Sequence, residues 1–280
     1  MGQFFTHLWL NNRSMVILIA ILIVVIPFLL FYLAKAKKEH PKGLIAAALS
    51  NMGERFGYYI MNAVLLLFLC SKFGIDDSVA GWIYAVFYFI IYIFSLPGGR
   101  IADRTQNYKG TIITGLVVMA LGYLLLSIPV FGETRGVNAI LVFTCFALLL
   151  IAFGNGLFKG NLQAIVGQMY DNFEAEAAKK GPEALALAKS KRDSGFQIFY
   201  VFINIGGVVA PFVAPLLRSA WLKVKGFTYN ADLPRLCHKF LDTNGAMSEV
   251  DSANIATLAE SAGHTGVVDA AFCDQYLNIF

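Results

Sequence analysis

Charged residues are scarce in this chain, and their distribution indicates its class. Only 14% of the 280 residues are Asp, Glu, Lys or Arg, whereas 58% are hydrophobic. A soluble domain carries about 25% charged residues. The deficit is uneven, because long apolar blocks alternate with short polar ones. This pattern excludes an ordinary soluble domain and is typical of a chain that crosses a membrane repeatedly.

The chain also lacks the residue patterns of common enzyme sites. It has no nucleotide-binding glycine loop, no His-x-x-x-His metal spacing and no nucleophile placed beside a base. We therefore predict that the protein is not an enzyme, that it has no metal site, and that it uses no organic cofactor. The net charge of +4 reflects the basic loops described below and gives no reason to expect nucleic-acid binding.

Six apolar blocks are long enough to cross a bilayer as helices. A helix needs about 20 mostly apolar residues for one crossing, and these blocks lack the alternation of membrane strands. The fifth is too long for one crossing, so its C-terminal part should project into the cytoplasm. Residues 218–280 contain no block of this length and are expected to form an enlarged loop. We predict spans at Ser14–Ala34, Leu44–Cys70, Val79–Pro97, Gly110–Val130, Asn138–Tyr170 and Ser194–Leu217.

Basic residues are distributed unequally between the two ends of these spans. An excess of Lys and Arg in short loops marks the cytoplasmic side. One set of loops carries 3 basic residues, namely Arg13, Lys72 and Arg135. The N-terminus and residues 218–280 lie on that side, which we predict to be extracytoplasmic. The opposite, cytoplasmic set carries 12: Lys35, Lys37, Lys38, Lys42, Arg100, Arg104, Lys109, Lys179, Lys180, Lys189, Lys191 and Arg192.

Three ionisable residues fall inside the predicted spans, where charge is costly and usually functional. They are Glu54 and Arg55 in the second span and Lys159 in the fifth. Neutral polar residues share their helical faces, so these faces should point towards protein or a water-filled cavity rather than lipid. The polar faces of four spans comprise Asn51, Glu54, Arg55, Tyr58, Tyr59 and Asn62; Tyr84, Tyr88 and Tyr92; Asn155, Lys159 and Gln163; and Gln197, Tyr200 and Asn204.

Four polar faces predict a central polar cavity. The alternative is that they only join helices, together with close-packing glycines such as Gly154 and Gly156. Neutral side chains suffice for joining, so the charged residues favour the cavity. Between the third and fourth spans, Gly98 and Gly99 are expected to end one helix in a tight turn, and Asp103 to precede the next helix.

Four segments resemble major facilitator transporters, three of them the proton-coupled oligopeptide transporter family. Residues 99–104, Gly-Arg-Ile-Ala-Asp-Arg, resemble the superfamily motif between its second and third helices. Residues 51–59, Asn-Met-Gly-Glu-Arg-Phe-Gly-Tyr-Tyr, resemble the family motif Glu-x-x-Glu-Arg-Phe-x-Tyr-Tyr. Residues 154–159 resemble its fourth-helix signature, and residues 199–206 match Phe-Tyr-x-x-Ile-Asn-x-Gly. The resemblance covers about residues 40–217.

The resemblance implies an all-α integral membrane fold, the N-terminal bundle of the major facilitator superfamily. It implies symport of di- and tripeptides with protons across the cell (inner) membrane by alternating access. Glu54 and Arg55 fall on the pair tied to proton coupling. The loop motif maps to Gly99, Asp103 and Arg104. The substrate positions map to Arg55, Tyr58, Tyr59, Tyr92, Lys159 and Asn204.

The resemblance also implies a domain plan. Residues 1–43 would form an extra N-terminal helix with a basic cytoplasmic linker, and residues 44–217 would form family helices one to five. Residues 218–280 would form an extracytoplasmic insertion before a missing sixth helix. We therefore expect a truncated N-terminal half that needs a C-terminal six-helix half, with peptide, protons and lipids as its other partners. Cys237 and Cys273 share the insertion, either as a disulfide or as unrelated thiols.

Two departures from the family pattern leave another function open. Asn51 replaces the first Glu of the first-helix motif, which removes a group that could carry a proton. Asn62 stands where the family commonly has a second Arg. The alternative hypothesis is therefore a major facilitator transporter of another small solute, or one with altered or lost proton coupling.

Overall fold

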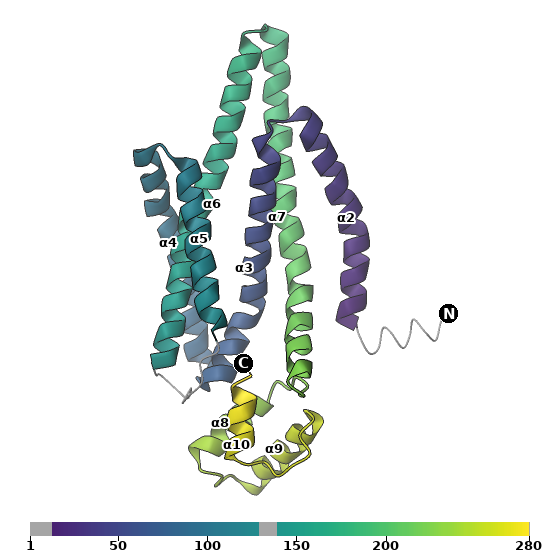
Figure 1. The fold of residues 1–280 in the computed structure, drawn as a ribbon, viewed down its shortest axis with the longest axis vertical. Coiled ribbons are helices and arrows are strands. Elements are labelled where there is room, and N and C mark those ends of the chain that lie inside the picture. Colours follow the sequence, from purple (N-terminus) through teal and green to yellow (C-terminus); the bar gives the residue numbers. More distant parts are fainter. Residues whose placement is uncertain (1–12, 129–138, 280) are drawn as a thin grey trace, which may run out of the picture. The chain divides into compact units, whose positions relative to one another are not determined.

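The computed structural model describes residues 13–128 and 139–279, and every regular element within them is a helix (Figure 1). Six of these helices are long and apolar enough to cross a membrane. The predicted all-α membrane architecture is thereby confirmed. The long helices are α2 (Arg13–Glu39), α3 (Gly43–Phe73), α4 (Asp77–Thr105), α5 (Tyr108–Ser127), α6 (Ala139–Ala178) and α7 (Pro182–Val224).

Each long helix corresponds to one predicted span, and most extend beyond it, whereas α5 ends at Ser127. Helix α6 continues past the predicted span end at Tyr170 to Ala178, and α7 begins at Pro182 instead of Ser194. The added segments pair as a hairpin, in which Arg192 of α7 contacts Asp171 at 2.7 Å and Glu174 at 3.3 Å. The predicted span ends at 130 and 138, together with Arg135, lie outside the described residues.

The chain divides into two compact units. The first unit carries all 12 basic residues that were assigned to the cytoplasmic side. As far as their residues are described, the first unit comprises Met1–Ala63, Tyr92–Val117 and Gly154–Leu216, and the second comprises Val64–Ile91, Val118–Phe153 and Leu217–Phe280.

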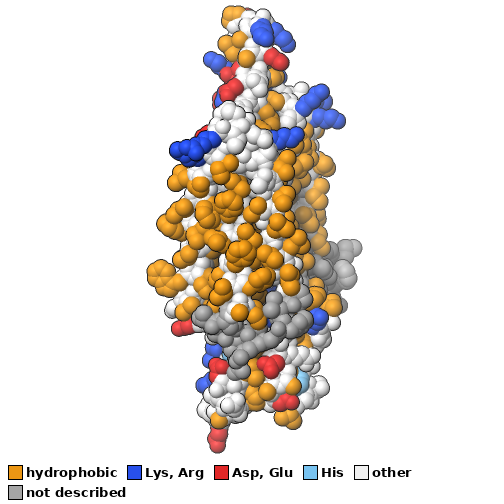
Figure 2. All heavy atoms as spheres, turned by 60° about the vertical axis from the view of Figure 1, so that its left-hand side comes forward, with side chains coloured by type: hydrophobic (Ala, Val, Ile, Leu, Met, Phe, Trp, Pro, Cys, Tyr) orange, Lys and Arg blue, Asp and Glu red, His pale blue; other side chains and the backbone are white. Residues whose placement is uncertain are grey.

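The outer surfaces of the long helices are apolar. Figure 2 shows hydrophobic side chains spread over these helices on one face, with Lys and Arg side chains around the α6–α7 hairpin. Helix α2 is the extreme case, because no described residue of its most apolar stretch is buried, and Ile23 is 67% exposed. Such surfaces are unfavourable in water and suit the hydrocarbon core of a membrane.

The prediction that Gly98 and Gly99 end a helix is wrong. Helix α4 runs through both residues to Thr105, and the turn follows at Gln106, whose φ is +51°. Asp103 therefore lies in the last turn of α4 and not directly ahead of the first turn of α5. Gly98 serves helix packing, because a Cβ there would collide with the backbone of Gly156 on α6. A glycine costs a helix only about 1 kcal/mol, which close packing can offset.

Glycines also bring other helices of the first unit into backbone contact. A Cβ added to Gly156 of α6 would lie 2.5 Å from the carbonyl carbon of Phe94 on α4. A Cβ added to Gly206 of α7 would lie 2.6 Å from the carbonyl oxygen of Met52 on α3. The expected role of small residues in close helix approach is thus confirmed at these positions.

Gly156→Ala should destabilise the first unit, because the added methyl group has no room. We expect a loss of about 1–3 kcal/mol in unfolding free energy, measured by thermal unfolding in detergent. The matched control is Gly160→Ala on the same helix, where an added Cβ meets no atom within 4 Å. That variant should be as stable as wild type or slightly more stable. Equal stability of the two variants would contradict the packing argument.

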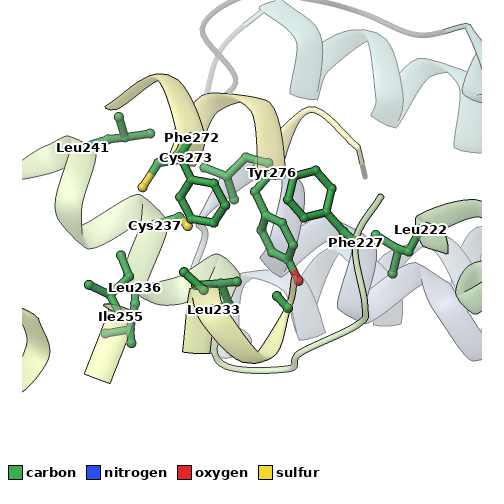
Figure 3. Packing of buried hydrophobic residues seen from close by; sticks show 13 residues of the cluster. Leu222, Phe227, Leu233, Leu236, Cys237, Leu241, Ile255, Phe272, Cys273 and Tyr276 are labelled. Carbon is green, nitrogen blue, oxygen red and sulfur yellow. The ribbon is translucent and has the colours of Figure 1, made fainter. Parts of the chain in front are cut away.

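Residues 225–279 are more ordered than the expected loop. They form three helices too short to span a membrane: α8 (Leu233–Asp242), α9 (Glu249–Ser261) and α10 (Ala270–Leu277). Side-chain caps begin two of them, since Ser248 accepts a hydrogen bond from the Asp251 backbone and Asp269 accepts one from Phe272. Figure 3 shows the apolar cluster that joins these helices to the end of α7.

Polar contacts attach these short helices to the long helices of the second unit. His238 of α8 lies with Nε2 2.9 Å from the carbonyl oxygen of Ser71 on α3. Lys72 donates a hydrogen bond of 3.3 Å to Asn278, and Trp221 of α7 donates one of 3.1 Å to the Ile279 carbonyl. Residues 225–279 therefore form a small helical subdomain anchored to α3 and α7.

The two cysteines of this subdomain lie together in its core (Figure 3). Cys237 and Cys273 are both free thiols and both fully buried. The hydrogen bond between the two thiols, together with burial, raises the pKa of Cys237. Because the thiolate is the reactive form, the folded protein should resist alkylation at this residue.

We expect iodoacetamide to leave Cys237 and Cys273 unmodified in the folded protein and to modify both after denaturation without reductant. Peptide mass spectrometry would measure this. Cysteines that become reactive in the denatured protein only after reduction would show that the pair is a disulfide.

Candidate functional site

A buried ion pair on α3 is the centre of the candidate site. The Nε of Arg55 lies 2.5 Å from Oε2 of Glu54, and its Nη2 lies 3.0 Å from Oε1. The side chains are 11% and 3% exposed, respectively. Adjacent residues on a helix normally point in different directions, so this contact requires both side chains to turn towards each other. The result is a two-point, charge-assisted contact inside the first unit.

Helix α6 adds a third hydrogen-bond donor to this carboxylate. The Nδ2 of Asn155 donates to Oε1 of Glu54. Asn155 is 1% exposed, and its Oδ1 has no hydrogen-bond partner among the described residues. The sequence placed Asn155 on the same helical face as Lys159 but did not reveal its contact with Glu54. We name Glu54, Arg55 and Asn155 the carboxylate cluster.

Two tyrosines of α3 adjoin the carboxylate cluster. The Arg55 guanidinium lies 4.9 Å from the centroid of the buried Tyr58 ring. Tyr59 packs edge-on against Tyr58, with ring centroids 5.4 Å apart. Helix α7 approaches closely here, because a Cβ on Gly207 would lie 3.0 Å from the Tyr59 ring. Arg55, Tyr58 and Tyr59 are therefore brought together, as the predicted site requires.

Lys159 lies on the same helix as Asn155, one turn further along. Its Nζ lies 4.2 Å from the ring centroid of Tyr92 on α4, a favourable cation–π distance. Lys159 is half-buried, and Tyr92 is 59% exposed. Among the described residues, no carboxylate lies within ion-pair distance of Lys159. The structure thus pairs two predicted site residues and leaves this ammonium group open to an anionic ligand.

Asn204 is the predicted site residue that joins none of these contacts. It is exposed on α7, and its Nδ2 donates a hydrogen bond of 3.1 Å to the Tyr200 carbonyl of its own helix. Within the described part of the chain, its side chain makes no hydrogen bond to another predicted site residue. The side chain is thus accessible to a ligand, as a role in binding would require.

The loop motif has contacts of its own at the end of α4. The Oδ1 of Asp103 accepts a hydrogen bond of 2.5 Å from the Tyr108 hydroxyl at the start of α5. Asp103 therefore joins two successive helices. Arg104 is exposed and forms no ion pair with a described residue, and Gly99 faces open space.

A buried histidine was also missed by sequence reasoning. The Nδ1 of His40, between α2 and α3, lies 2.7 Å from the hydroxyl of the fully buried Tyr170 on α6. Burial lowers the pKa of His40, with Lys191 and Lys35 acting in the same direction and Glu39 opposing them. The contact joins the linker after α2 to α6.

Comparison with known proteins provides independent information on this chain. Residues 109–235 match the model of the POT family. An uncharacterized transporter of Bacillus subtilis, YclF, is 31% identical over 193 residues, which are 67% of this chain and 34% of that protein. A di-/tripeptide transporter of Lactococcus lactis subsp. lactis is 30% identical over 180 residues, which are 62% of this chain and 31% of that protein.

A third relative is matched over a similar number of residues. The peptide transporter YePEPT of Yersinia enterocolitica is 32% identical over 188 residues, which are 65% of this chain and 32% of that protein. The chain thus spans about a third of the length of the curated relatives it matches. All three relatives are named as transporters.

Proposed function

We propose that the chain, whose residues 109–235 match the POT family, forms the N-terminal part of a transporter that carries di- and tripeptides together with protons. The observation that carries the proposal is the carboxylate cluster, a buried acid–base arrangement in helices long enough to span a membrane. It lies in the same compact unit as Lys159, a cation that forms no ion pair with a carboxylate among the described residues. The proposed activity is transport and not an enzymatic reaction.

The site residues have complementary tasks in this proposal. Lys159 and Arg55 attract the substrate carboxylate, because charge-assisted hydrogen bonds strengthen where water is partly excluded. Tyr58, Tyr59, Tyr92 and Asn204 bond the peptide amide groups, which every di- and tripeptide shares. Glu54 takes up and releases the coupled proton. The proton is the coupling ion, and no other cofactor takes part.

The proposal also includes a location and partners. The protein lies in the cell (inner) membrane as a multi-pass protein, with lipid around its apolar faces. The N-terminus and residues 218–280 are extracytoplasmic. A C-terminal half supplies the groups that bind the substrate ammonium and complete alternating access. Asp103, Gly99 and Arg104 act in the conformational change.

Uptake of a radiolabelled dipeptide by cells that express the intact protein containing this chain tests the proposal. We expect accumulation above that of control cells, and we expect a protonophore to reduce it to equilibration. Undiminished accumulation after the proton gradient is removed would contradict proton coupling. Failure to take up any dipeptide would contradict the substrate class.

A second candidate function is a transporter of another small solute, or one without proton coupling. Asn51 favours it, because this residue is only 7% exposed and lies on the face of α3 that carries Glu54. An amide at this position cannot carry the proton that a carboxylic acid would. Competition by other small solutes in the same uptake assay separates the two candidates.

A further inference from the structure

Two asparagines on α6 are held in different ways. Asn161 is 2% exposed, and its Nδ2 donates to two backbone carbonyls, Gly98 at 3.0 Å and Leu157 at 2.8 Å. These bonds fix its amide and join α6 to α4. Asn155 has a single hydrogen bond, to Glu54, and a buried Oδ1 without a partner among the described residues. Each amide therefore makes one hydrogen bond to another helix, but the second bond of Asn161, to Leu157 of its own helix, fixes its orientation, and the described residues offer Asn155 no such second bond.

The orientation of the Asn155 amide follows from the charge on Glu54. An ionised carboxylate only accepts hydrogen bonds, so Asn155 must present Nδ2 to it. Glu54 then accepts from three donors: Nε and Nη2 of Arg55 and Nδ2 of Asn155. All three suit the ionised form, whereas a protonated acid has an O–H that needs an acceptor and can accept the other donors only through its remaining lone pairs.

We propose that the side-chain amide of Asn155 rotates when Glu54 is protonated, so that Oδ1 takes the place of Nδ2 and accepts a hydrogen bond from the new O–H. The orientation of Asn155 then reports the protonation state of Glu54, and in this sense Asn155 senses the proton. The inference rests on the proposed function, because it assumes that Glu54 carries the coupled proton. The proton comes from water and binds Oε1, the oxygen that contacts Asn155. Without the turn, the new O–H and the Asn155 N–H would be two donors facing each other.

Rotation of the Asn155 amide should require little free energy. The terminal torsion of an asparagine is broad and roughly two-fold, so both orientations are accessible. In one orientation Oδ1 lacks a partner, and in the other Nδ2 takes its place. Each orientation leaves one amide atom without a partner, so the protonation state of Glu54 decides which of the two orientations is favoured. A leucine or valine at this position could serve neither state.

The surroundings hold the Asn155 backbone in place while its side chain turns. The neighbouring Gly156 packs against the backbone of Phe94. The carbonyl of Gly154 would lie 2.7 Å from a Cβ on Gly115 of α5. The residues directly before and after Asn155 are thus closely packed against neighbouring helices, so a rotation of the amide does not require the backbone of α6 to move.

A pair of variants of equal shape tests the proposal in the intact protein. A threonine hydroxyl both donates and accepts hydrogen bonds, whereas valine of the same shape does neither. We expect Asn155→Val to reduce proton-driven dipeptide accumulation about 10-fold, the effect of losing one hydrogen bond to a charged group. Its counterflow, which requires no net proton movement, should be retained. Asn155→Thr should restore most of the proton-driven accumulation.

The outcomes separate this inference from the proposed function. Normal proton-driven accumulation by Asn155→Val would overturn the sensing role and leave proton-coupled transport intact. Equal loss of accumulation and counterflow in both variants would also overturn it, because Asn155 would then be structural. Gradient-independent uptake by the wild-type protein would overturn the proposed function itself. Size-exclusion chromatography of each variant in detergent confirms that it is folded.

Discussion

Lys159→Ala should lower the affinity of the intact protein for a dipeptide by about 100-fold, the effect of removing one partner of a partly buried charge contact. Lys159 has no carboxylate partner among the described residues, so a substrate carboxylate is the anion we expect it to bind. Equilibrium binding of a labelled dipeptide to the purified protein measures the change. Membrane insertion should be unaffected.

A variant of a second lysine shows whether the loss of one positive charge is by itself enough to lower dipeptide affinity. Lys189→Ala removes the same charge from an exposed position in the α6–α7 hairpin and should leave affinity unchanged. If Lys159→Ala also binds normally, Lys159 only packs against Tyr92 and is structural. If both variants lose affinity, the effect comes from net charge rather than from the site.

Glu54→Gln should abolish proton-driven accumulation and retain counterflow. The amide has nearly the volume of the carboxylic acid and keeps one oxygen acceptor for Arg55, but it cannot release a proton. The carrier should then equilibrate the dipeptide without concentrating it. Counterflow and accumulation assays in the same proteoliposomes measure the two activities side by side.

A folding role for Glu54 would give another result. Breaking a buried ion pair leaves the other charge uncompensated, at a cost of about 3–5 kcal/mol. If Arg55 depends on Glu54 in this way, Glu54→Gln should lose counterflow as well as accumulation, and its melting temperature should fall. Loss of both activities would therefore contradict the coupling role.

The membrane helices were predictable because a bilayer imposes a simple length and composition on them. The polar face of α3 was predictable for a related reason, since Glu54 and Arg55 are too costly to face lipid. The structure buries both side chains, as that argument requires. The pairing of Lys159 with Tyr92 could not be read from the sequence, because the two residues come from different helices.

The incorrect prediction of a helix end came from the interpretation of glycine. Gly98 was interpreted as a turn residue, whereas it lies within α4 and packs against α6. Sequence alone does not distinguish the two uses, because both depend on the absence of a Cβ. The difference lies in the neighbouring helix, whose Gly156 backbone fills the space.

The short helices of the second unit were missed for a different reason. Their lengths, from 8 to 13 residues, fall below what a membrane span needs, so a search for spans passes over them. Signals were present, since Ser248 and Asp269 are favourable helix-capping residues. The contact of Asn155 with Glu54 carried no comparable signal beyond its place one turn before Lys159.

Peptide-induced proton movement is the direct test of proton coupling through Glu54. Proteoliposomes that contain the intact protein and a pH-sensitive dye would receive a dipeptide from outside, with no initial pH difference. The account predicts acidification of the lumen by the wild-type protein and none by Glu54→Gln. Dipeptide entry into wild-type liposomes without acidification would contradict it.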